Sequence, residues 1–353
     1  MFRMTYHIEV GGMVLPLLTS VKIRKDVKSL SDTATIICPA VSHFRPLAFA
    51  QNVKKGQRVS IALGYDDDNR QEFDGFVKSV AIDDNQLIIE CEDPLYVFRR
   101  VDIPNGEKTN VTLKQLLDYV LGEVNAYIRS EELGEPLKLN CLYDYGYKTF
   151  RFVNATAYDF MDQIQKEGKP NIFISGGVLN IVPQYTHTNG TARYSMQRNI
   201  CRDGLKLKWR GETDKDLYVE VKAKDINGGE ITATVGKPGG ETIKLNLPGG
   251  RDKASLQTIA GNLYKSQVYT GYEGSFKGWL VPFCDAGYVA EVTDVANELR
   301  NGRYYVEAVE VSFSSAGGVR TVQIGACILR PHELLPALPA PPSRAIAGSQ
   351  RSR

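Results

Sequence analysis

Histidine is the side chain that most often serves as a general base or as a zinc ligand, and the chain has four of them. None lies in an HExxH pattern or at another common metal spacing, and none accompanies a GxSxG nucleophile motif. The four are His7, His43, His187 and His332. The sequence therefore predicts neither a zinc centre nor a serine hydrolase.

Two groups of carboxylates have a spacing that chemistry could use. Asp66–Asp68 could hold Ca²⁺, but the segment lacks the glycine and the distal glutamate of an EF-hand loop, which favours a solvated hairpin tip. Glu90 and Glu92 fall on one face of a predicted strand, with Asp93 beside them, and could form the carboxylate pair of a glycoside hydrolase. Their position at a strand end next to Pro94 favours a solvated structural role.

Glycine clusters and tryptophans suggest two further kinds of site. Residues 236–240 and Gly249–Gly250 resemble phosphate loops, but neither carries the GK[ST] sequence that leads into a helix, so β-turns are the better interpretation. Trp209 and Trp279 could stack on a sugar ring, although packing in a core or an interface is commoner. We predict no catalytic, cofactor-binding or metal-binding residue, and therefore no enzyme.

The composition is that of a soluble globular protein with several domains. The chain has 353 residues, 42% hydrophobic and 24% charged, and its net charge of +2 predicts no strong attraction to nucleic acid or to a membrane surface. We expect no signal peptide and no membrane helix, because no apolar run is long enough. Six scattered cysteines without a CxxC pair predict free thiols in a reducing cytoplasm: Cys38, Cys91, Cys141, Cys201, Cys284 and Cys327.

Apolar periodicity divides the chain into two β regions around a mixed region. Residues 1–100 alternate as strands, and 101–203 contain two helices, over 113–128 and about 157–166, capped by Thr112 and Thr156. Residues 204–330 return to strands, with a helix inserted around 252–270. The last segment, 331–353, contains five of the 16 prolines and predicts a flexible tail. The fold class is mainly β with α/β insertions.

Gly271–Leu329 organises the C-terminal region, with four strand-like segments separated by glycine turns. The order of its features is similar to that of residues 55–92. In both, a glycine precedes a strand, a polar loop, a strand rich in aromatic residues and valine, a tight turn and a last strand. Duplication and chance similarity of two meanders both explain this order.

Several stretches, taken in order, resemble one known family. They are SLSDTATIICP (29–39), VxKGQxVxIxLGY (53–65) with EFDGFV (72–77), IxCEDPLY (89–96), FxNATAYDFM (152–161) and the glycine-punctuated segment 271–329. Together they span most of residues 15–330, and none is a catalytic signature. The chain resembles the baseplate hub proteins of contractile-tailed phages, the late-control-D-like hubs, and the hub half of type VI secretion spike proteins.

The resemblance implies two similar antiparallel β-barrel tube domains (1–100 and 204–330), a peripheral α/β domain (101–203) and a homotrimeric ring of approximate sixfold symmetry. Such a hub would join the hexameric tail tube above to the trimeric central spike below. Tape-measure protein and DNA would occupy the lumen, and baseplate wedge proteins would contact the α/β domain. The resemblance also implies that the chain is assembled in the host cytoplasm and becomes part of the tail baseplate of a phage, a tailocin or another injection particle.

Two alternatives come from other functional classes. A β-rich module that binds carbohydrate or protein could use the two tryptophans and the many tyrosines as a sugar platform, and a peptidoglycan hydrolase would need an acid or a metal site. The missing export signal disfavours the first, and the missing catalytic residues disfavour the second.

Overall fold

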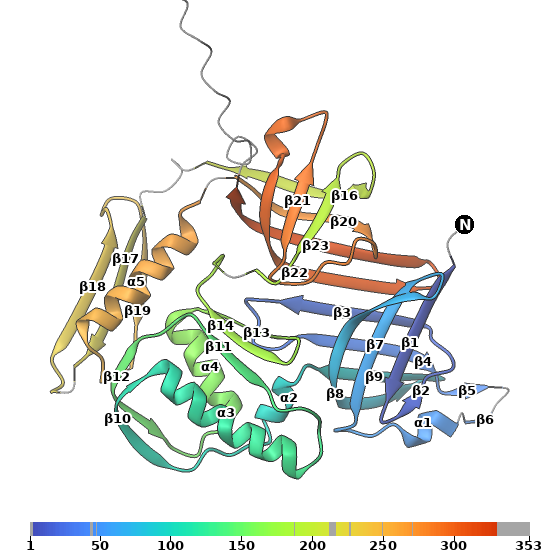
Figure 1. The fold of residues 1–353 in the computed structure, drawn as a ribbon, viewed down its shortest axis with the longest axis horizontal. Coiled ribbons are helices and arrows are strands. Elements are labelled where there is room, and N and C mark those ends of the chain that lie inside the picture. Colours follow the sequence, from blue (N-terminus) through green and yellow to red (C-terminus); the bar gives the residue numbers. More distant parts are fainter. Residues whose placement is uncertain are drawn as a thin grey trace, which may run out of the picture.

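The structure is a computed structural model, and it describes residues 3–42, 45–46, 48–186, 188–211, 217–225, 227–248, 250–269 and 271–329. The predicted flexible tail, 331–353, lies outside the described residues. Strands dominate, and 13 of them belong to one large sheet (Figure 1). Within these ranges, no helix is both long and apolar enough to span a membrane.

The first half of the large sheet comes from the N-terminal region, and we call it lobe 1. Its strands alternate buried and exposed residues; in β4, Ala34, Ile36 and Cys38 point into the core. The strands run in the order β3-β4-β9-β8-β7-β1-β2. They are β1 (Met4–Val10), β2 (Met13–Val14), β3 (Ser20–Asp26), β4 (Thr33–Pro39), β7 (Arg58–Tyr65), β8 (Asp68–Asp83) and β9 (Gln86–Glu92), with the short β5 (Val41–Ser42), β6 (Arg45–Pro46) and α1 (Ala48–Asn52) between β4 and β7.

The second half comes from the C-terminal region, and we call it lobe 2. It runs in the order β16-β20-β23-β22-β21-β15. The elements are β15 (Thr191–Ser195), β16 (Ile200–Arg210), β20 (Gly271–Trp279), β21 (Val289–Thr293), the 3-10 turn η2 (Glu298–Arg300), β22 (Gly302–Ser314) and β23 (Gly317–Leu329). Lobe 1 has the same order when its short β2 is left out. If the six strands of each lobe are numbered along the chain, both sheets run 2-3-6-5-4-1, which is β3-β4-β9-β8-β7-β1 in lobe 1. The lobes differ in one pairing, because β1 runs antiparallel to β7 whereas β15 runs parallel to β21.

The two lobes share one sheet and one hydrophobic core. β3 of lobe 1 pairs antiparallel with β22 of lobe 2, from Ser20 opposite Ser314 to Asp26 opposite Ala308. The core cluster beneath combines residues such as Ile8 and Ile36 with Phe276 of the other lobe. Among the described strands no closed barrel is found, contrary to the prediction of two barrels. The reason is visible in lobe 1, where the outer edge of β3, which closure would require, is occupied by β22.

The α/β region lies beside lobe 1 and contains the two predicted helices (Figure 1). Each begins with a capping box, Thr112 with Gln115 and Thr156 with Asp159, which satisfies two free backbone N–H groups. The helices are slightly longer than predicted, α3 (Leu113–Ser130) and α4 (Ala157–Gly168). The other elements are α2 (Leu95–Phe98), β10 (Gly106–Thr112), β11 (Lys138–Cys141), β12 (Gly146–Phe152), β13 (Asn171–Ser175) and β14 (Val178–Val182).

A separate three-stranded sheet interrupts lobe 2 between β16 and β20. It consists of β17 (Leu217–Lys224), β18 (Glu230–Gly236) and β19 (Glu241–Asn246), followed by α5 (Lys253–Gln267). Asp252 caps α5 by accepting a hydrogen bond from the Ser255 backbone N–H at 2.7 Å. Its buried side chains, such as Val219 and Ile259, belong to the core of the α/β region and not to the core under the large sheet.

Candidate functional site

The residues singled out for metal chemistry are not brought together. His7 is exposed on β1, and the other three histidines lie outside the described residues. Within the described ranges, no three His, Cys, Asp or Glu side chains are arranged to hold a metal ion. The five cysteines whose side chains are described are all free thiols.

Asp66–Asp68 form the tip of the β7–β8 hairpin. Tyr65 pairs with Asp68, and both Asp66 and Asp67 adopt positive φ, which is the geometry of a two-residue type I′ turn. Two arginines contact the tip: the Arg3 backbone N–H donates to Asp66 and its side chain pairs with Asp67, and Arg70 pairs with Asp68. The acidic cluster is therefore a turn with two arginine partners.

Glu90 and Glu92 have different environments. Glu90 is exposed and accepts a hydrogen bond from the Ser79 hydroxyl at 2.6 Å. Glu92 is buried, and Arg99 donates to it at 2.9 Å. Burial acts to raise the pKa of Glu92, but the hydrogen bonds and the charge of Arg99 outweigh it and lower the pKa below its usual value. A general acid needs the opposite shift, so the pair does not fit glycoside hydrolysis.

The two tryptophans lie on opposite faces of the sheet. Trp209 of β16 pairs with Tyr272 of β20, which shares the core-facing side with Phe276. Trp279 is three residues after Phe276 on the same strand and faces the other side. They cannot form one sugar-stacking platform. The glycine segment 236–240 is the turn between β18 and β19.

Charged pairs inside the sheet, which the sequence analysis did not single out, join the two lobes. Arg320 of β23 and Glu72 of β8 are both almost fully buried, and Arg320 donates to both carboxylate oxygens, at 2.6 and 3.2 Å. Its guanidinium also donates to the carbonyls of Leu280 and Cys284. Arg320 occupies a core-facing position on the same side of β23 as the buried Val322. A charged residue on the apolar face of a predicted strand is therefore the sequence feature that could have indicated a buried ion pair.

A cavity of about 770 Å³ separates lobe 1 from the α/β region, and acidic groups line it. Lys25 pairs with Asp285 at 2.8 Å, which ties β3 to the loop before β21. Burial and, to a smaller degree, the Asp285 carboxylate raise the pKa of the neighbouring Asp32 to about 7, against the attraction of Lys25. Burial and Asp32 likewise raise the pKa of Asp93 well above its usual range. The Asp32 carboxyl therefore carries a proton at mildly acidic pH.

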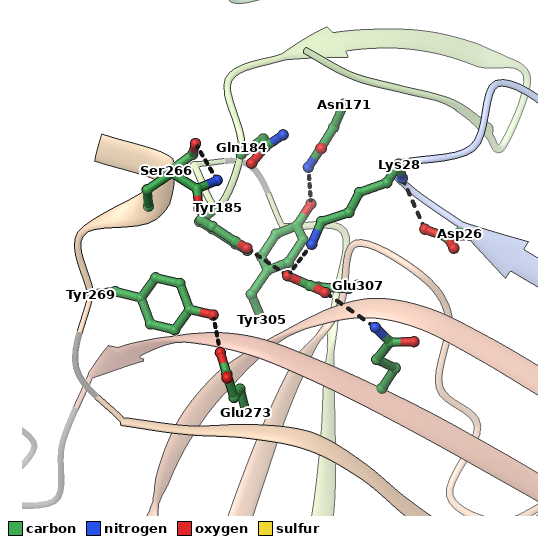
Figure 2. A network of polar contacts seen from close by, with 12 residues as sticks. Asp26, Lys28, Asn171, Gln184, Tyr185, Ser266, Tyr269, Glu273, Tyr305 and Glu307 are labelled. Atoms are coloured by element: carbon green, nitrogen blue, oxygen red, sulfur yellow. Dashed lines mark hydrogen bonds and ion pairs between the residues drawn. The ribbon is translucent and has the colours of Figure 1, made fainter. Parts of the chain in front are cut away.

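A second polar cluster joins the lobes to the α/β region (Figure 2). Glu307 of β22 is buried and accepts hydrogen bonds from the Tyr185 hydroxyl at 2.5 Å and from the Lys28 ammonium at 2.7 Å. Beside it, the Asn171 side chain donates to the Tyr305 hydroxyl at 3.3 Å. Burial and the nearby Glu307 carboxylate raise the pKa of Tyr185, which keeps its hydroxyl protonated as a donor. The cluster fixes three chain segments with respect to each other.

Among the described residues, the side chains that could do chemistry are not assembled into one site. The buried charges are paired across strands and lobes, and the predicted chemical residues are separated or neutralised.

No protein-family model matches the chain, and no curated protein matches its sequence. Solved structures match its fold. A tail protein from Neisseria meningitidis MC58 is 12% identical with a TM-score of 0.64, and the match covers 91% of this chain and 96% of that one. The 43 kDa tail protein of prophage MuSo2 from Shewanella oneidensis is 14% identical with a TM-score of 0.59, covering 92% and 98%.

A third match comes from a secretion apparatus. An Escherichia coli component of the type VI secretion system, described as structurally similar to the T4 bacteriophage tail proteins gp27 and gp5, is 10% identical with a TM-score of 0.54. The match covers 90% of this chain and 76% of that one. The chain therefore has the fold of phage tail proteins and of this type VI secretion component, which confirms the resemblance seen in its sequence.

Proposed function

We propose that the chain is a structural hub of a phage tail or of a related injection particle. The observation that carries the proposal is the likeness of fold to tail proteins over about nine-tenths of the chain. The repeated strand order supports it, because a chain with two similar lobes provides six lobes when three copies assemble. Such a ring would match a sixfold tube on one side and a threefold spike on the other.

The two lobes act as the tube domains of this hub. In the assembled ring they would surround a common lumen, which would pass tape-measure protein and DNA. A net charge of +2 suits a lumen through which a polyanion must slide without strong binding. The α/β region, which lies beside lobe 1, would face outward toward wedge proteins. The hub is assembled in the host cytoplasm and becomes part of the tail baseplate.

The test is the mass of the purified chain in solution, measured by light scattering, together with negative-stain images of the same peak. The proposal expects a ring near three times 39.2 kDa with an open centre. A chain that stays monomeric at every concentration and fails to join purified tube protein would refute it.

A further inference from the structure

The internal junction between the lobes uses one particular pair of strand edges. β22 has β23 on one edge; on the other edge its first part pairs with β21 and its second part, Ala308–Ser314, pairs with β3 (Figure 1). In the shared strand order, β8 of lobe 1 corresponds to β22, and β16 of lobe 2 corresponds to β3. A second junction of the same kind would therefore join β8 to β16.

In the single chain this second junction is not made. The first part of β8 pairs with β7 as far as Phe76, and the backbone of Val77 bonds to the loop at Gly56–Gln57. Beyond that point, residues 78–83 pair only with β9, and no described strand occupies their other edge. β16 likewise pairs only with β20 among the described strands. Both edges carry backbone groups that are free to pair.

Each of these edges carries apolar side chains on the core side of the sheet that are incompletely covered. The β8–β9 and β22–β23 hairpins both close with a two-residue turn. When these turns are aligned, Ile82 of lobe 1 is the structural equivalent of Phe313 in lobe 2. Phe313 is covered by β3 and is 5% exposed, whereas Ile82 is 66% exposed. Ile82 pairs with the fully buried Leu87 and so faces the core side. It lacks the cover that β3 gives to its counterpart.

The edge of β16 presents a matching stripe. Leu205 and Leu207 pack against the core from the side but are only partly buried, and Trp209 continues the same face with 46% of its surface exposed. In the geometry of the internal junction, residues 78–83 of a neighbouring strand reach Leu205 and Leu207, and Trp209 lies beyond them. Apolar stripes on both edges would then meet across the new pairing, as Val21 meets Phe313 in the internal junction.

We infer that β8 of one copy pairs antiparallel with β16 of the next copy, through residues 78–83, and repeats the internal β22–β3 junction between chains. Each copy offers one edge of each kind, so the contact is heterologous and generates a ring when the rotation closes. That three copies close the ring rests on the proposed function. The edge pairing itself rests on the strand order and on the uncovered apolar side chains.

The internal junction also fixes the register. Ser312 lies opposite Lys22 in the β22–β3 pair. The turn alignment makes Ala81 the lobe 1 equivalent of Ser312. From the aligned hairpins, the strand pairings can be followed across β9 and β4 to β3 in lobe 1, and across β23 and β20 to β16 in lobe 2. They make Cys201 the lobe 2 equivalent of Lys22. Ala81 of one copy is therefore expected opposite Cys201 of its neighbour. Directly opposed residues in an antiparallel pair have Cα atoms about 4.5–5.5 Å apart, which suits a disulfide.

The experiment places one cysteine on β8 of the full chain. Oxidised Ala81→Cys protein is expected to run as covalent oligomers on a non-reducing gel and as monomer after reduction. Adding Cys201→Ser should abolish the link. The matched control is Ser312→Cys, the same change at the equivalent position in the internal junction, which faces Lys22 and should stay unlinked.

A second variant tests the apolar cover. Ile82→Lys buries a charge in the new pairing and is expected to weaken self-association at least about tenfold by light scattering, since the loss of one buried aliphatic side chain alone accounts for that factor. The control is Val14→Lys on β2, which is also exposed but lies on neither edge. A ring that assembles without the Ala81→Cys link would overturn the pairing and leave the hub intact. A chain that never self-associates would overturn the pairing, and one that also fails to join purified tube protein would overturn the hub.

Discussion

Replacing Arg320 by methionine removes the cation that neutralises Glu72 inside the sheet. The side chains of Arg320 and Glu72 are only 1% and 2% exposed, so the carboxylate that remains is buried without a counter-charge. Removing one member of a buried pair costs about 3–5 kcal/mol of unfolding free energy. Glu72→Gln, which leaves the guanidinium without its counter-charge, is expected to cost a similar amount.

The double variant Glu72→Gln/Arg320→Met separates charge pairing from other effects. It removes both charges and leaves two carbonyls, of Leu280 and Cys284, without their donor, at about 1 kcal/mol each. The double variant should therefore lose about 2–3 kcal/mol, far less than the sum of the single losses, and the coupling energy should be about 3 kcal/mol or more.

Urea unfolding followed by the fluorescence of the two tryptophans measures these free energies. The loss in Arg320→Met should also shrink at acidic pH, because burial raises the pKa of Glu72 and a protonated carboxyl needs no counter-charge. The control is Arg193→Met, which breaks the exposed pair with Glu291 and should cost less than about 1 kcal/mol. Additive single and double losses, or single losses no larger than that of the control, would refute the reasoning.

Three further predictions concern the junctions and the α/β region. The pKa of Asp32 is raised to about 7 in the folded chain. The stability that its protonated form contributes is therefore fully present below the pKa of the unfolded chain and is lost as the pH rises toward 7. The melting temperature should fall over that pH range, and Asp32→Asn should flatten the dependence of the melting temperature on pH. Tyr185→Phe keeps the ring but removes the hydrogen bond to the Glu307 carboxylate, and calorimetry should show a loss of about 1.5–3 kcal/mol; an unchanged melting temperature would contradict the role of the cluster. Phe160→Ala empties the aromatic core of the α/β region, which should cost about 3–5 kcal/mol and expose this region to limited proteolysis before the large sheet is cut.

Local features of the sequence determined the local structure. Thr112 and Thr156 cap their helices because each hydroxyl accepts a hydrogen bond from an N–H three residues ahead, and this depends only on neighbouring residues. The alternation of apolar residues in segments such as 33–39 likewise determined both the strand and its buried face. The acidic tip at Asp66–Asp68 was predicted as a hairpin turn for the same reason.

Only the tertiary structure decided which strands and charges meet. β22 pairs with β3 across more than 280 residues, and the backbone groups that join them are the same in every sequence. Arg320 and Glu72 lie 248 positions apart, so neither residue carries a local sign of the other. The place of β17–β19 beside the α/β region, and the open edges of β8 and β16, also depend on packing between distant segments. Side-chain periodicity specifies the faces of a sheet, but the order of its strands is set by contacts that form only when the whole chain folds.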